Sequence, residues 1–206
     1  MAEIGAIILA AGRSTRFSKD AQEATKLVAV LRGKPLVRHV AEAALRSVAR
    51  PIVVVTGHRR AEVEAALQGL DLSFAINPDY AAGLSSSLKR GVAALPTASA
   101  GALILLGDMP LVSSALIDRL IAAFVHAADV APQNPLAAAP RRGGVRGNPV
   151  LLSRALFPAV AKLDGDRGAR ALIDSIGKRL VECDVEDEAP LIDIDTKEAL
   201  RGLELD

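Results

Sequence analysis

Three cations and two aspartates are the side chains of this 206-residue sequence whose types and positions suit phosphate chemistry. Arg13, Arg16 and Lys26 follow an apolar run that breaks at Gly12. Small residues let backbone amides approach a ligand closely, and arginine can hold two phosphate oxygens at once. The segment therefore suits a nucleotide-binding loop, and an ordinary strand-to-loop turn with solvated cations is the alternative.

The aspartates supply chemistry of the opposite charge. Asp108 comes almost directly after the apolar run 102–106, where a carboxylate is poorly hydrated unless a cation or a hydrogen-bond donor meets it. Carboxylates, together with phosphate oxygens and waters, are the usual protein ligands of magnesium. We therefore expect Asp108 to bind a metal rather than to cap a turn. Asp195 is the candidate second ligand, with a solvated turn residue as its alternative.

Alternating strand and helix patterns must position these side chains. Short apolar runs predict buried strands at 6–10, 52–56, 72–76 and 102–106. Apolar residues at helical spacing predict helices near 36–48, 63–70, 84–95 and 116–124. Such alternation is typical of the α/β class, here a three-layer α/β/α sandwich around a mainly parallel, Rossmann-like sheet.

Polar residues are expected at the ends of these elements. Ser85, Ser86 and Ser87 are expected to cap the third helix, and Ser113 or Ser114 the fourth. Ligands of open parallel sheets bind beyond the carboxyl ends of the strands. The segments expected to converge there are 10–17, 56–58, 77–78, 107–108 and, if its segment joins the sheet, Asp195.

Beyond residue 127 the sequence becomes richer in loops. Short strands are expected near 136–139, 149–152 and 180–185, and helices through 156–163, 172–176 and 197–203, the last begun by Thr196. We find no internal repeat and no low-complexity linker. Residues 1–206 are therefore expected to form a single domain.

The composition narrows the partners and the compartment. Lys and Arg number 25 against 24 Asp and Glu, so no net field attracts nucleic acid or an anionic membrane. Aromatic residues are only 2% of the chain, which leaves few platforms for stacking single-stranded nucleic acid. The lone Cys183 cannot form an internal disulfide, and neither a signal peptide nor an apolar run of about 18 residues is evident. A cytoplasmic location is expected.

Four sets of residues stand in one order along the chain: 9–16 with Lys26, 77–88, 107–110, and 165–170 with 193–196. Together they resemble the molybdenum cofactor cytidylyltransferases, a branch of the MobA-like NTP transferase superfamily. The Leu-Ala-Ala-Gly sequence at 9–12 is similar to the cytidylyl rather than the guanylyl enzymes. Two features differ from the family pattern. Ser18 replaces a glycine, with 19–25 lengthening the gap before the lysine, and Gly-Asn-Pro at 147–149 replaces Gly-His-Pro.

The resemblance implies a nucleotidyltransferase that joins CMP from CTP to the terminal phosphate of molybdenum-molybdopterin and releases pyrophosphate. It implies that Asp108 and Asp195 bind Mg²⁺ and that Lys26 and Arg16 act on the triphosphate. Substrate contacts are implied for Leu9, Ala10, Ala11, Gly12, Arg13, Ser14, Thr56, Asn77, Gly83, Ser85, Ser86, Ser87, Gly107, Asp166, Gly168 and Arg170. Residues 1–126 would form the nucleotide-binding half and 127–206 the acceptor-binding half. A recipient molybdoenzyme is a further implied partner.

Other functions remain open at this point. A guanylyltransferase, or a sugar or alditol nucleotidyltransferase, could use the same fold and the same cations. A non-catalytic carrier could hold the finished molybdenum cofactor and deliver it to a molybdoenzyme. A nucleotide-binding regulator would need no second acidic ligand. The presence of both Lys26 and Asp108 favours an enzyme.

Overall fold

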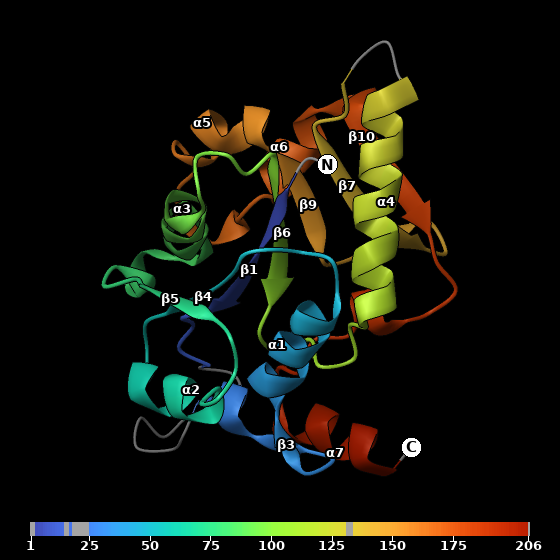
Figure 1. Ribbon diagram of the computed structural model, residues 1–206. Coiled ribbons are helices and arrows are strands. Elements are labelled where there is room, and N and C mark those ends of the chain that lie inside the picture. The colour runs from blue at the N-terminus through green and yellow to red at the C-terminus, as the bar shows by residue number, and fades with distance from the viewer. Residues whose placement is uncertain (1–2, 15–16, 18–24, 131–133, 206) are drawn as a thin grey trace.

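A single sheet forms the centre of the molecule in the computed structural model, which describes residues 3–14, 17, 25–130 and 134–205. The strands of this sheet are β1 (Ile4–Ala10), β4 (Ile52–Thr56), β5 (Ser73–Ile76), β6 (Gly101–Leu106), β7 (Ala137–Arg142), β8 (Val145–Arg146), β9 (Val150–Ser153) and β10 (Leu180–Asp184). They lie in the order β10-β7-β9-β6-β1-β4-β5, with β8 paired to β7 (Figure 1).

Most of the sheet is parallel. β1 pairs in parallel with β4 and β6, β4 with β5, and β10 with β7. β9 is antiparallel to both β6 and β7, so it joins the first part of the chain to the later part within one sheet. The predicted α/β class and mainly parallel, Rossmann-like sheet are confirmed.

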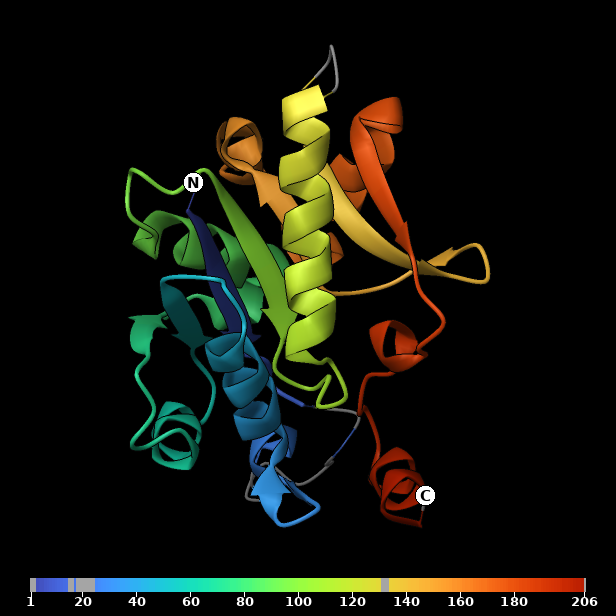
Figure 2. The same cartoon turned by 45° about the vertical axis from the view of Figure 1, so that its right-hand side comes forward.

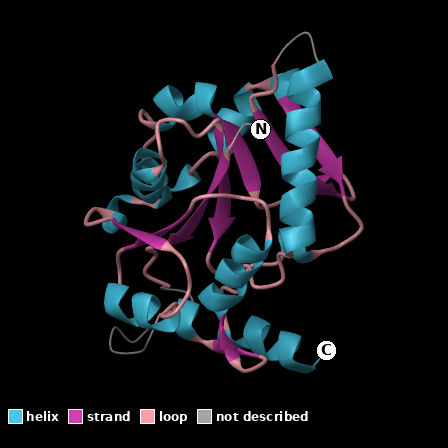
Figure 3. Cartoon of the chain, viewed as in Figure 1, coloured by secondary structure: helices cyan, strands magenta, loops and turns pink. Residues whose placement is uncertain are grey.

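Helices cover both faces of the sheet (Figure 3). They are α1 (Leu36–Arg46), α2 (Arg60–Ala66), α3 (Leu84–Ala94), α4 (Ser114–Val130), α5 (Phe157–Val160), α6 (Arg170–Ser175) and α7 (Lys197–Leu205). Figure 2 shows α4 crossing in front of the sheet. None of the helices in the described ranges has the length and apolar character needed to cross a membrane.

The central strand β1 divides the core between these two layers. Because side chains of a strand alternate between its faces, Ala6 and Ile8 pack with α1, α2 and α4, whereas Ile7 and Leu9 pack with α3, α5 and α6. All seven residues of β1 are buried. A strand buried on both faces explains the unbroken apolar run in the sequence.

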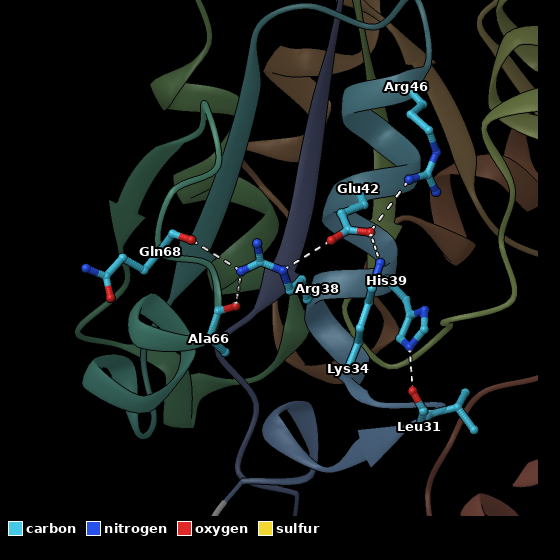
Figure 4. Close-up of polar contacts among 8 residues, drawn as sticks. All are labelled: Leu31, Lys34, Arg38, His39, Glu42, Arg46, Ala66 and Gln68. Atoms are coloured by element: carbon cyan, nitrogen blue, oxygen red, sulfur yellow. Dashed lines mark hydrogen bonds and ion pairs between the residues drawn. The ribbon is translucent and has the colours of Figure 1, made fainter.

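A small hairpin precedes α1 and is linked to it by polar contacts (Figure 4). Its strands are β2 (Val30–Leu31) and β3 (Lys34–Pro35). His39 of α1 contacts the carbonyl oxygen of Leu31 through Nε2 at 2.8 Å, and Arg38 donates to the carbonyl oxygen of Ala66 at 3.0 Å. Glu42 accepts hydrogen bonds from Lys34 and Arg38. The network joins α1 to the end of α2 and to the hairpin.

Several element ends differ from the sequence-based expectation. Ser85, Ser86 and Ser87 lie inside the first turn of α3 and do not cap it, because the N-cap position is Gly83. The helix expected through 156–163 is a 3₁₀ turn followed by the short α5. Residues 192–195 do not join the sheet. The expected caps of α4 and α7 are confirmed, since Ser113 Oγ accepts from Leu116 N–H and Thr196 Oγ1 from Ala199 N–H.

Candidate active site

Lys26 and two aspartates meet beyond the carboxyl end of the parallel strands. Lys26 begins a 3₁₀ turn (Lys26–Val28), Asp108 follows β6, and Asp195 precedes α7. The ammonium Nζ of Lys26 lies 2.6 Å from Asp108 Oδ2 and 2.6 Å from Asp195 Oδ1. The three side chains are only 12%, 18% and 20% exposed, respectively. Lys26, Asp108 and Asp195 thus lie together, and Asp195 does so although its segment does not join the sheet as the expectation required.

Backbone contacts hold the two acidic segments together. The N–H of Ile194 donates to the carbonyl oxygen of Asp108 at 2.9 Å. The Ile194 side chain is fully buried against Leu31 and Leu36. The tail therefore reaches Asp108 through its backbone, although it adds no strand to the sheet, and Leu31 of the hairpin packs against it.

Hydrogen bonds hold Ser14 against the turn that carries the lysine. The Ser14 hydroxyl contacts the Thr25 hydroxyl at 3.1 Å and accepts from the backbone N–H of Lys26 at 3.3 Å. Near the end of β1, Gly107 N–H donates to the carbonyl oxygen of Leu9 at 3.0 Å. The described residues after β1 are thus linked both to the lysine turn and to the segment that carries Asp108.

Burial and neighbouring charges shift the pKa values of Lys26 and Asp193. Burial by itself lowers the pKa of Lys26, but the neighbouring Asp108 and Asp195 carboxylates outweigh it and leave that pKa raised. Asp193 has a raised pKa because partial burial and the charges of Asp195 and Asp108 all disfavour its ionised form. Lys26 is therefore firmly cationic at neutral pH, and Asp193 protonates more readily than an ordinary aspartate.

Asp193 is a site residue that the sequence analysis did not assign. One carboxylate oxygen from each of Asp108, Asp193 and Asp195 lies within 4.8 Å of the others. Residues two apart in an extended segment point to the same side, so the Asp-Ile-Asp spacing was the signal that could have indicated it. The cluster provides three oxygen ligands, the type that hard divalent cations prefer.

A cavity of about 490 Å³ opens in front of this cluster. The described residues that line it are Leu9, Ala11, Gly12, Arg13, Ser14, Phe17, Lys26, Leu27, Tyr80, Ala81, Gly83, Leu84, Ser87, Leu106, Asp108, Asp166, Asp193 and Asp195. Two cations, Arg13 and Lys26, and the three aspartates of the acidic cluster line this one cavity, which suits an anionic ligand that carries a metal ion.

A larger cavity of about 820 Å³ adjoins it. The described lining residues shared by the two cavities are Leu9, Leu84, Leu106 and Asp166. The larger cavity is also lined by Gly168 and Arg170, and by Arg146, which donates to Asp174 at 2.9 Å. Two adjoining cavities with a common wall can hold two substrates side by side.

Most of the chain matches one protein family. Residues 6–182 match the model of the MobA-like NTP transferase domain. The chain belongs to this family. Among curated relatives, the bifunctional protein GlmU of Syntrophotalea carbinolica is 36% identical over 120 residues, which cover 58% of this chain and 25% of that protein. The chain thus spans about a quarter of the length of that relative.

Solved structures agree with the assignment to the MobA-like family. Rv0371c from Mycobacterium tuberculosis H37Rv is 26% identical with a TM-score of 0.80, covering 100% of this chain and 98% of that one. A nucleotidyl transferase from Methanothermobacter thermautotroptrophicus (Mth528) is 26% identical with a TM-score of 0.82, covering 98% and 96%. These relatives support assignment of this chain to the nucleotidyltransferase class of enzymes.

A divalent cation fits the acidic cluster of this MobA-like domain. A complex of Rv0371c with manganese is 26% identical to the chain, with a TM-score of 0.77 and coverage of 100% of this chain and 99% of that one. In the present chain, the three aspartate oxygens within 4.8 Å of one another form a donor set suited to such an ion. The chemistry of the donors and the similarity to a manganese complex therefore both favour a divalent cation.

The predicted substrate contacts fall into those that line the smaller cavity, those that line the larger cavity, and those outside the described lining of both. Those that line the smaller cavity are Leu9, Ala11, Gly12, Arg13, Ser14, Gly83, Ser87 and Asp166, and those that line the larger one are Leu9, Asp166, Gly168 and Arg170. The predicted contacts outside the described lining of both cavities are Ala10, Thr56, Asn77, Ser85, Ser86 and Gly107. Arg16 lies outside the described residues.

Thr56 and Asn77 are buried, outside the described lining of the two cavities. Thr56 is fully buried, and its hydroxyl donates to a carboxylate oxygen of Glu64 at 3.4 Å. Asn77 donates to the hydroxyls of Ser86 and Ser87 at 2.9 and 3.0 Å, and its side-chain oxygen accepts from Asp79 N–H. Asn77 therefore organises the segment that leads into α3.

Proposed function

We propose that this protein joins CMP from CTP to the terminal phosphate of a molybdopterin-type acceptor that carries molybdenum, with release of pyrophosphate. The observation that carries the proposal is the meeting of Lys26 with Asp108 and Asp195 in a cavity that shares a wall with a second, larger cavity. The family match, and the residues at 9–16 and 77–88 that resemble the cytidylyl enzymes, support it.

The reaction needs little proton transfer from the protein. A phosphate monoester has its second pKa near 6, so the attacking acceptor phosphate is largely dianionic at neutral pH. Its oxygen forms a bond to the α-phosphorus of CTP, and the bond to the pyrophosphate leaving group breaks. The obstacle is the approach of two anions, so positioning and charge neutralisation should supply most of the acceleration.

The smaller cavity would bind the nucleotide. Lys26 and Arg16 would hold the triphosphate, and the backbone amides of 11–14 would surround its oxygens. Asp108 and Asp195, with Asp193 beside them, would hold Mg²⁺, which neutralises phosphate charge when bound. The carboxylates would then keep a divalent cation beside Lys26, and the two cations together would offset the charge of the triphosphate.

The larger cavity would bind the acceptor. Asp166 lies on the wall common to both cavities and accepts a hydrogen bond from Leu84 N–H at 3.3 Å. Gly168 and Arg170 continue the same segment along the larger cavity, and Arg170 offers a charge for the phosphate of the acceptor. In this proposal residues 1–126 form the nucleotide-binding half and 127–206 the acceptor-binding half of a single domain.

Product identification by mass tests the proposal. Purified protein is incubated with Mg²⁺, each of the four nucleoside triphosphates in turn, and molybdopterin with and without molybdenum. We expect a cytosine dinucleotide together with one equivalent of pyrophosphate. Preferential use of GTP would assign a guanylyltransferase instead. Turnover only with sugar or alditol phosphates would assign the sugar-type reaction, and tight retention of finished cofactor without pyrophosphate release would assign a carrier.

A further inference from the structure

Tyr80 is an aromatic side chain in the smaller cavity to which the proposed reaction assigns no role. It is the single tyrosine of the chain, which has no tryptophan. The guanidinium carbon of Arg13 lies 5.9 Å from the centre of the Tyr80 ring, and the His58 ring centre lies 5.7 Å away at an interplanar angle of 52°. An exposed arginine on the ring indicates that this ring is open to a flat, electron-poor group.

The Cβ end of the Tyr80 side chain packs against residues that directly follow β1 and β4. At Gly57, directly after β4, an added Cβ would lie 2.9 Å from the Cβ atoms of both Tyr80 and Ala11. Asn77 orders the chain just before the ring through its bond to Asp79 N–H. Tyr80 therefore packs closely at the carboxyl ends of the interior strands β1 and β4, which reduces the conformational freedom to be lost when a ligand stacks on its ring.

The acidic cluster and Lys26 determine which part of a nucleotide could reach the ring. They line the same cavity as Tyr80 and attract the triphosphate with its metal ion. With the phosphates held there, the nucleobase is the flat portion left to meet the aromatic ring. Every base offers a π-face, so stacking on an aromatic side chain strengthens binding whichever base is present.

Other stacking partners are less suitable among the described residues. Phe17 also lines the smaller cavity, but it packs against the small core formed by Leu31, Leu36 and Ile194. The described lining of the larger cavity contains no aromatic side chain. Among the described residues that line the two cavities, Tyr80 in the smaller cavity is therefore the ring best placed to stack on a flat ligand.

We infer that Tyr80 is the stacking platform for the nucleobase of the bound triphosphate, and that the base takes over the ring face now shared with Arg13. Tyr80 is then a binding and specificity residue that favours nucleotides over bare phosphates. The inference rests on the proposed function, because it takes a nucleoside triphosphate as the ligand of this cavity. Arg13 is exposed and lines the same cavity as Lys26, so once freed from the ring its guanidinium would be available to the phosphates.

Calorimetric titration with CTP and with inorganic tripolyphosphate tests the platform. Tyr80→Leu should weaken CTP binding roughly 10-fold or more and change tripolyphosphate binding less than twofold, whereas Tyr80→Phe should keep CTP binding within about twofold. Phe74→Leu, at an exposed aromatic on the edge strand β5, is the matched control. Equal weakening of both ligands by Tyr80→Leu, or loss of CTP binding in Tyr80→Phe, would overturn the inference.

Fluorescence of the unmodified protein gives a second readout that does not depend on a variant. With one tyrosine and no tryptophan, the emission excited near 280 nm comes from Tyr80. CTP should quench it more than it dims free N-acetyltyrosinamide at equal concentration, and tripolyphosphate should not. Nucleotide binding by calorimetry without quenching overturns the platform and leaves the transferase proposal intact. Absence of binding by all four nucleoside triphosphates overturns both.

Discussion

The ammonium nitrogen of Lys26 and a carboxylate oxygen of Asp108 are 2.6 Å apart, and the same nitrogen is equally close to Asp195. Carboxylates that share a site repel one another unless a cation lies between them. Lys26 supplies such a cation through its contacts with both carboxylates. A metal ion and this lysine therefore compete for the same oxygens, whereas a bound triphosphate gives the lysine other oxygens to contact.

Removal of the Lys26 charge should strengthen metal binding and weaken nucleotide binding. In the absence of nucleotide, Lys26→Met should bind Mn²⁺ at least about tenfold more tightly than the parent protein, because the competing ammonium is gone. Free Mn²⁺ measured by electron paramagnetic resonance gives the affinity. Lys178→Met, at an exposed position, is the control. Unchanged Mn²⁺ affinity in Lys26→Met would refute the competition.

Asp108→Asn should lower turnover by at least about a hundredfold, which is the effect expected from loss of one well-placed electrostatic group. The exposed Asp71→Asn is the control for removal of a carboxylate. Release of pyrophosphate from CTP in the presence of acceptor is the measurement. Release by Asp108→Asn at nearly the parent rate would contradict the role of this carboxylate.

The raised pKa of Asp193 makes a prediction about stability and pH. An aspartate whose pKa is higher in the folded than in the unfolded protein stabilises the fold at low pH, and that contribution is lost as pH rises through the raised value. Without metal, Asp193→Asn should therefore melt at a higher temperature than the parent at neutral pH. The difference should vanish below the ordinary aspartate pKa. A neutral-pH melting temperature below that of the parent would count against the prediction.

Gly83→Ala should destabilise the protein more than Gly69→Ala. Both glycines have positive φ angles, +100° and +82°, so both alanines suffer backbone strain of about 1–3 kcal/mol. At Gly83 the new Cβ would also lie 2.6 Å from a backbone carbon of Gly165 and 2.6 Å from Asp166 Oδ1, whereas at Gly69 the space is open. Chemical unfolding of the two variants gives the comparison. Equal losses of unfolding free energy in the two variants would contradict the prediction.

Periodicity predicted most of the sheet and the outer helices, because β1, β4 and β6 are continuous apolar runs and α1 and α3 have apolar stripes. The hairpin of β2 and β3 was missed. Its two-residue turn, Arg32-Gly33, has both φ angles positive, but arginine at the first position is not the usual signal for such a turn.

The site was predictable where charged residues follow apolar runs and not where tertiary packing sets the contact. Lys26, Asp108 and Asp195 could be selected from residue type and position alone. The Asp-Ile-Asp spacing could have indicated that Asp193 lies on the same side as Asp195, but its approach to Asp108 is visible only in the folded tail. The burial of Thr56 and Asn77 behind the cavity likewise depends on the approach of α2 and α3, which no local pattern specifies.

The tail that carries Asp193 and Asp195 follows every described strand of the sheet, and it is held by the packing of Ile194 against Leu31 and Leu36. During synthesis on the ribosome, the strands β1 to β9 thus emerge well before these two aspartates. Until the tail arrives, Asp108 is the one aspartate of the cluster available to Lys26, and the set of three acidic side chains is incomplete.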